Sequence, residues 1–299
     1  PKSTAASFPS VILLRNRDYP FVKLLRAIHM PDHEIIEAFP SSQLPHVGTY
    51  RRVLPVSLVR MYENALDWEH LPYVHETSFA GIECLDAGPW GWRAKTTSPA
   101  GDENVIELRL DRACRRWITR TLSGRNQGSE IWTHAFPIGE ERVDIVVDFF
   151  VPGVAPEHRE KVGKVYANLY STLYDEDVAM MVERQTQLDR RLERSSPADR
   201  EVDLGVRSSL SLPLEVEVGG RAYLVNESDA GLVVYPALCP HQLGPLGDAA
   251  IVDGAVTCPW HGYAFDVRTG DCLTGQTCRF SEVPEIDEQD GRVRLRARH

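Results

Sequence analysis

The sequence has no long apolar run. Its stretch Val11-Ile12-Leu13-Leu14, for example, is far shorter than the roughly 20 residues that a transmembrane helix needs. The start also lacks the succession of basic, apolar and small residues that marks a secretory signal peptide. These absences argue against a membrane-spanning or exported protein, and we expect a cytoplasmic one.

Cysteine is scarce as well. Six cysteines in 299 residues do not resemble the disulfide framework of a small secreted domain. Four of them belong to no motif and are expected to be reduced thiols, with a disulfide between the last two as the alternative: Cys84, Cys114, Cys272 and Cys278.

Positive charge is in deficit. Lysine and arginine number 33 against 43 aspartates and glutamates, which gives a formal net charge of −10. Such a chain is poorly suited to nucleic acid or an anionic membrane, and neither is expected as a partner. A partner protein with a basic surface is a better match for the negative charge of this chain.

Two segments near the C-terminus each pair one cysteine with one histidine. The first holds Cys239 and His241, and the second holds Cys258 and His261. Two thiolates and two imidazoles suit a [2Fe-2S] cluster in which the thiolates bind one iron and the imidazoles bind the other. Tetrahedral zinc is the alternative, but zinc fingers pair cysteine with cysteine and histidine with histidine.

These two segments resemble the cluster loops of Rieske domains. Respiratory Rieske proteins carry an extra cysteine in each loop, and the matching positions here are Gly244 and Trp260. A serine that hydrogen-bonds the cluster in those proteins is matched by Tyr263. Since fewer hydrogen bonds to sulfur lower the potential, the resemblance implies the low-potential type of cluster, which supplies an oxygenase.

The pattern of apolar residues predicts a sheet followed by a long helix. Apolar and polar residues alternate in Val105–Asp111, Arg116–Thr121 and Val143–Val151, which indicates antiparallel strands. After Pro156 an apolar stripe recurs at helical spacing and includes Tyr166, Tyr170, Leu173, Asp177, Met180 and Met181. This succession resembles the helix-grip fold, in which the helix closes a cavity.

The expected class is therefore α+β, with two domains. A helix-grip domain at residues 49–195 is followed by a polar linker at 196–203 and a small all-β domain at 204–299, where short β-rich runs alternate with turns. Residues 1–48 contain no motif that indicates a role.

A second metal site is predicted from two histidines in the first domain. His70 and His75 would lie about 140° apart on an ideal helix, too far round to share a metal. Pro72 disfavours helical geometry before it, so we expect the chain to bend and bring the two imidazoles together. Two core histidines without a metal are the alternative.

The third ligand is expected from the long helix. Asp177 falls on its apolar stripe, whereas Asp175 lies on the opposite side. A carboxylate that points into a core is costly unless it is paired, and a metal would pair it. His70, His75 and Asp177 thus form the facial triad of non-haem Fe(II) oxygenases, with positions left open for O₂ and substrate.

The pattern of Asn64, Asp67, His70 and His75, with the later pair Glu176-Asp177, resembles the catalytic domain of Rieske non-haem iron oxygenases. In that family the aspartate of the first motif is no ligand but hydrogen-bonds a cluster histidine. The resemblance therefore implies that Asp67 bridges the two metal sites, with His261 as its partner. The domain order here is reversed, with the Rieske domain last.

The resemblance further implies an oxygenase that takes electrons from a ferredoxin or a flavin reductase, and depends on NAD(P)H only through that partner. It implies a homotrimer in which His261 of one chain meets Asp67 of the next. Because the domain order is reversed, pairing of the two domains within one chain is the alternative. The expected reaction uses O₂ to hydroxylate or demethylate a small, largely apolar compound, with Phe79 among the candidate cavity walls. A Rieske electron carrier fused to a ligand-binding module without oxygenase activity is the alternative.

Overall fold

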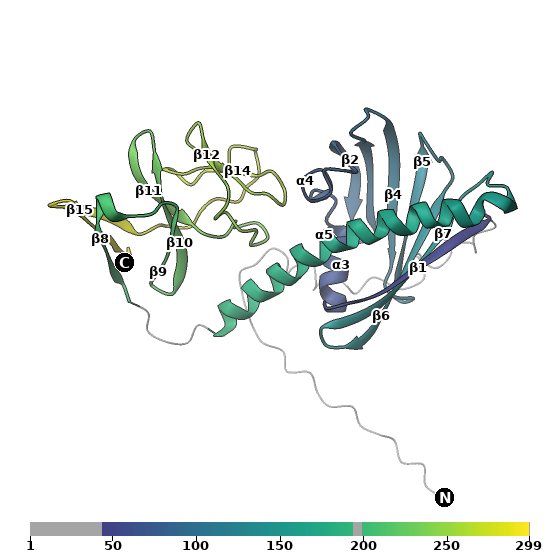
Figure 1. Cartoon of the computed structure of the whole chain (residues 1–299), viewed down its shortest axis with the longest axis horizontal. Helices are drawn as coiled ribbons and strands as arrows, with labels where there is room; N and C mark the ends of the chain where they lie inside the picture. Colours follow the sequence, from purple (N-terminus) through teal and green to yellow (C-terminus); the bar gives the residue numbers. More distant parts are fainter. Residues whose placement is uncertain (1–43, 194–198, 299) are drawn as a thin grey trace, which may run out of the picture. The chain divides into compact units, whose positions relative to one another are not determined.

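Seven antiparallel strands form the sheet of the N-terminal domain. In this computed structural model, residues 44–193 and 199–298 are described. The strand order is β1-β7-β6-β5-β4-β3-β2 (Figure 1). The strands are β1 His46–Leu54, β2 Gly81–Gly88, β3 Gly91–Thr97, β4 Glu103–Asp111, β5 Arg116–Ser123, β6 Glu130–Gly139 and β7 Arg142–Phe150.

The alternation predicted for the last strand is confirmed. In β7, Val143, Ile145, Val147 and Phe149 are fully buried on one face of the sheet. In β4 the alternation is broken, because Glu107 is buried next to Leu108. Arg93 and Arg109 both donate hydrogen bonds to the Glu107 carboxylate, which offsets the cost of its burial.

Helices connect the strands and close the domain. Between β1 and β2 lie α3 Leu58–Leu66 and the short α4 Leu71–Val74, and after β7 a 3₁₀ turn, η1 Pro156–His158, leads into α5 Arg159–Glu193. Helix α5 runs along one face of the sheet (Figure 1), where Tyr174 and Met181 join the same buried core as Phe149. This arrangement is the predicted helix-grip fold, with Tyr174 rather than Leu173 at the centre of the buried stripe.

Two glycines allow α5 to approach the sheet edge. A Cβ at Gly163 of α5 would lie 2.2 Å from the carbonyl oxygen of Val47, and a Cβ at Gly48 would lie 3.0 Å from the Cα of Gly163. The helix and β1 thus touch backbone to backbone, which only glycine permits.

Gly163→Ala is expected to destabilise the protein, although alanine normally stabilises a helix by about 1 kcal/mol relative to glycine. The added methyl group must displace backbone, so we expect a net loss of about 1–3 kcal/mol in the free energy of unfolding, measured by urea denaturation. Gly139→Ala is the control, since its Cβ would meet only the Cβ of Arg142 at 3.7 Å. A more stable Gly163→Ala protein would contradict this packing.

The C-terminal domain is built from three small antiparallel sheets, ordered β11-β10-β9, β12-β13-β14 and β15-β16-β8. Its elements are β8 Glu201–Val206, the 3₁₀ turn η2 Arg207–Ser209, β9 Leu214–Val218, β10 Arg221–Ser228, β11 Gly231–Pro236, β12 Ile251–Val252, β13 Ala255–Thr257, β14 Ala264–Asp266, β15 Glu285–Gln289 and β16 Arg292–Arg296.

The domain boundaries differ from those expected in two places. Strand β1 begins at His46, within the segment 1–48 for which no role was predicted, and most of that segment lies outside the described residues. Strand β8 begins at Glu201, inside the expected linker 196–203, because it pairs with β16. Among the helices that the structure describes, none has the length and hydropathy to cross a bilayer.

Candidate redox and metal site

Two similar turns carry the four cluster-ligand candidates. In the turn after β11, the backbone N–H of Cys239 donates to the carbonyl of Gly244, and in the turn after β13 the N–H of Cys258 donates to that of Tyr263. Each turn has a residue of left-handed conformation four positions after its cysteine, with φ of 67° at Leu243 and 65° at Gly262. The two turns therefore share a backbone conformation, although the histidine follows its cysteine by two residues in the first turn and by three in the second.

The four side chains meet at one place. Cys239 and Cys258 are buried, and the ring centroids of His241 and His261 lie 4.6 Å apart. Burial and the neighbouring His261 lower the pKa of His241 to about 4, which keeps that imidazole neutral, as a metal ligand must be.

The atoms that would face a cluster are left without partners. Nδ1 of His241 and Nδ1 of His261 are both buried and make no hydrogen bond. A Cβ at Gly244 would lie 2.8 Å from the sulfur of Cys258, so the residue matching the extra cysteine of respiratory proteins leaves no room for a side chain. Two thiolates and two free imidazole nitrogens fit a [2Fe-2S] cluster.

The predicted triad is also assembled. The ligand atoms of His70, His75 and Asp177 all lie within 4.8 Å of one another, and all three side chains are buried. Nε2 of His75 is 3.1 Å and Nε2 of His70 is 3.4 Å from Oδ1 of Asp177. Asp175, by contrast, is exposed on the other side of α5 and pairs with Arg52.

His70 and His75 meet for a different reason from the one expected. Pro72 does not break a helix; it lies in the first turn of α4, where its missing N–H costs nothing. His70 precedes that short helix and His75 ends it, with φ −112° and ψ 45°. The two imidazoles, 5.2 Å apart between ring centroids, are thus held at the two ends of one helical turn.

Neighbouring polar groups orient the triad. The Glu176 carboxylate accepts a hydrogen bond from Nδ1 of His75 at 2.7 Å, which turns Nε2 towards Asp177. The amide of Asn64 donates to Oδ1 of Asp177 at 2.9 Å. Both ring nitrogens of His70 are buried without a hydrogen bond, which fits a role as a metal ligand.

The pKa shifts of His70 and Asp177 also fit a metal site. Burial by itself lowers the pKa of His70, but the carboxylates of Asp177 and Asp67 raise it to about 10. Burial likewise opposes ionisation of Asp177, yet the two imidazoles hold the pKa of this carboxyl below its usual value. The pocket thus stabilises a positive charge between the carboxylates, and a divalent metal would supply it.

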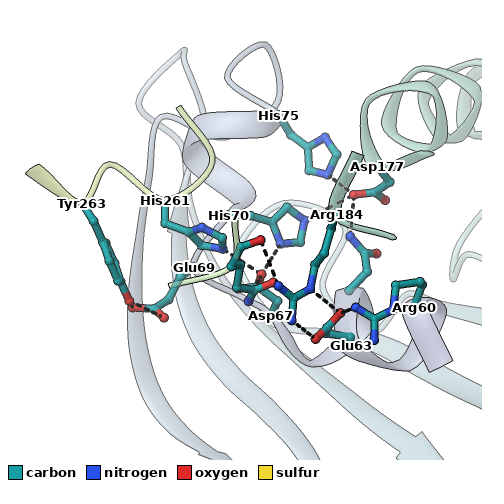
Figure 2. A network of polar contacts seen from close by, with 12 residues as sticks. Arg60, Glu63, Asp67, Glu69, His70, His75, Asp177, Arg184, His261 and Tyr263 are labelled. Atoms are coloured by element: carbon teal, nitrogen blue, oxygen red, sulfur yellow. Dashed lines mark hydrogen bonds and ion pairs between the residues drawn. The ribbon is translucent and has the colours of Figure 1, made fainter. Parts of the chain in front are cut away.

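Asp67 joins the triad to the cluster loops (Figure 2). It ends α3, and its Oδ2 accepts a hydrogen bond of 2.8 Å from Nε2 of His261 and one of 2.9 Å from the amide of Gln242. The same oxygen lies 3.8 Å from Nδ1 of His70. These bonds keep the pKa of the buried Asp67 carboxyl below its usual value, although burial opposes this. One carboxylate therefore contacts an imidazole of each site.

Comparison with known proteins decides what the C-terminal domain is. Residues 200–284 match the family model of the Rieske [2Fe-2S] domain. This segment is a Rieske domain. Its fold, its two turns and its ligand set agree with that identification, so the chain is a Rieske electron-transfer domain fused behind a helix-grip domain.

Similar sequences match only a small part of this chain. "Apoptosis-inducing factor 3" of Mus musculus is 37% identical over 57 residues, which is 19% of this chain and 9% of that protein. "Dicamba O-demethylase, oxygenase component" of Stenotrophomonas maltophilia is 36% identical over 50 residues, which is 17% of this chain and 14% of that protein. The matched part thus spans about a tenth of the length of these curated relatives.

One solved structure is similar to part of the chain. Norcoclaurine synthase from Thalictrum flavum has a TM-score of 0.37 and 14% sequence identity, and the match covers 58% of this chain and 98% of that one. The family match begins at residue 200 and does not extend to the helix-grip domain.

The contacts that Tyr263 and Arg184 make between the two domains were not foreseen. Tyr263 stacks on His241 and donates its hydroxyl hydrogen to both carboxylate oxygens of Glu69, each at 3.0 Å. Arg184 of α5 binds the Glu63 carboxylate through two nitrogens (Figure 2). It also donates a hydrogen bond to the backbone carbonyl of Gln242. Glu69 lies inside the His70 motif, but nothing in the sequence shows which distant residue it meets.

In this structure Asp67 contacts His261 of the same chain. Arg184 of α5 links the first cluster turn to α3 of the same chain through Gln242 and Glu63. The homotrimer stays a prediction, but this junction does not require it.

Proposed function

We propose that this chain is a Rieske-type oxygenase that oxidises a small, largely apolar compound. Cys239, His241, Cys258 and His261 would hold the [2Fe-2S] cluster, and His70, His75 and Asp177 would hold a mononuclear Fe(II). The observation that carries the proposal is the convergence of three buried ligand atoms within 4.8 Å beside a carboxylate that also binds His261.

The protein's own groups prepare this site. Iron bound there would supply the activation of O₂. Glu176 fixes the His75 tautomer, Asn64 orients the Asp177 carboxylate, and Asp67 holds the His261 ring in register with His70. The ring of Phe79 lies 6.4 Å from that of His75, so it is the candidate for apolar contact with substrate.

Electrons would come from a ferredoxin or flavin reductase with a basic docking face. The net charge of −10 supports this choice of partner. NAD(P)H would act only through that partner.

A Rieske electron carrier fused to a ligand-binding helix-grip module is the second candidate. The observation that favours it is the extent of the similarity, since the family match covers only residues 200–284. If the protein were only an electron carrier with a ligand-binding module, the buried triad of His70, His75 and Asp177 would have no role.

Labelled O₂ distinguishes the two candidates. The holoprotein, a chemical reductant and a panel of small apolar compounds are incubated under isotopically labelled O₂, and products are analysed by mass spectrometry. An oxygenase is expected to give a labelled hydroxylated product, or a demethylated product with labelled formaldehyde. Compounds that bind the protein without product formation would support the carrier instead.

A further inference from the structure

Cys272 and Cys278 face each other beside the cluster loops. The segment after β14 folds back on itself, so that Asp271 pairs with Arg279 in an antiparallel bridge reinforced by an ion pair of 3.3 Å. In an antiparallel pair the residue numbers run in opposite directions, so Cys272 and Cys278 are the next facing pair. Facing Cα atoms lie about 4.5–5.5 Å apart, within the range that a disulfide spans.

The two thiols interact with each other, and one of them has a lowered pKa, which favours its oxidation. Each is half-buried, and each interacts with the other. Burial raises the pKa of a thiol, but the Thr274 hydroxyl, 3.3 Å from the Cys272 sulfur, and the backbone amides of Thr274 and Gln276 bring the pKa of Cys272 below its usual value. Cys272 is therefore the better nucleophile of the pair.

The pair lies against the core that holds the cluster. Both cysteines pack on the group of buried residues that includes Cys239, Cys258 and Phe265. Phe265 pairs with Cys272 in a further bridge, and the N–H of Leu273 donates to the carbonyl of Ala264 at 2.8 Å. A crosslink here would fix the segment that follows the second cluster turn.

We propose that Cys272 and Cys278 are an oxidisable dithiol, which closes into a reversible disulfide and clamps this segment onto the cluster core. The oxidant is a peroxide. The Cys272 thiolate attacks it and becomes a sulfenic acid as the O–O bond breaks and one water leaves. The Cys278 sulfur then displaces the hydroxyl as a second water. The sulfurs lose two electrons and two protons in all, and a thiol reductant returns them.

Mass spectrometry tests the pair directly. Trypsin releases both cysteines in one peptide, Thr269–Arg279, which contains no other cysteine. The holoprotein is treated with one equivalent of hydrogen peroxide, unfolded, alkylated and digested, while its cluster absorption is recorded. We expect this peptide to be lighter by two hydrogens and not alkylated, and to take two alkyl groups after treatment with dithiothreitol.

Single variants provide the control. In Cys272→Ser and Cys278→Ser the remaining cysteine is expected to be alkylated or oxidised to a sulfur acid. The clamp also predicts that wild-type protein loses its cluster absorption in air several-fold more slowly after oxidation of the pair. A wild-type peptide that still takes two alkyl groups after peroxide would overturn the disulfide, and equal rates of cluster loss would overturn the clamp.

Discussion

Asp177→Ala is expected to remove the mononuclear iron, and with it all O₂-coupled turnover, while the Rieske spectrum stays unchanged. The Asp177 carboxylate contacts both imidazoles of the triad and is the only acid among its three ligand candidates. Its loss leaves two neutral ligands, which bind Fe(II) far more weakly. Metal analysis of anaerobically prepared protein should show about three irons per wild-type chain and about two in the variant.

Asp175→Ala is the matched control on the same helix. Asp175 has an exposed side chain paired with Arg52, away from the triad. This variant should keep all the iron and the full turnover. An Asp177→Ala protein that retained the third iron, or still formed product, would show that the ligand assignment is wrong.

Asp67→Asn should keep both metal sites but slow the reoxidation of the reduced cluster by O₂ by about 10–100-fold, the usual range for a lost partner of a metal-bound histidine. Oδ2 of Asp67 accepts from both His261 and Gln242 and lies beside His70. An asparagine of the same shape brings no negative charge, and its amide nitrogen cannot accept these hydrogen bonds.

Stopped-flow absorption of the chemically reduced cluster after mixing with O₂ measures this rate. Glu69→Gln is the control, because Glu69 belongs to the same turn but binds the Tyr263 hydroxyl, and glutamine can still accept that bond. Its reoxidation should stay close to that of the wild type. Equal rates in Asp67→Asn and wild type would remove Asp67 from the path between the sites.

Local patterns carried most of what the sequence could predict. The alternation in β7 depends only on neighbouring residues, and all four of its predicted core residues are fully buried. Each cysteine–histidine pair of cluster ligands lies within one tight turn, so two residues that are close along the chain are also close in space. Asp177 could be separated from Asp175 because a helix fixes which residues share a face.

Contacts between distant segments could not be predicted in the same way. Strand β8 reads as a polar linker because its partner β16 lies at the far end of the domain. Glu107 breaks the alternation of β4, since two arginines make its burial tolerable. Arg184 is one of several charged residues in a long helix, and its contacts with Gln242 and Glu63 could not be predicted because both partners are distant in sequence.

The central claim of this account is that the cluster and the triad of one chain act as a single redox unit. To test it, reduced wild-type chains are diluted into an excess of a variant that carries both His70→Ala and His261→Ala, and subunits are allowed to exchange. The rapid reoxidation of wild-type clusters by O₂ is then measured by stopped flow. A junction within one chain predicts that the rapidly reoxidised fraction per wild-type chain does not change with dilution. A fraction that falls as the variant is added would contradict the account, because each wild-type cluster would then depend on the triad of a neighbouring chain.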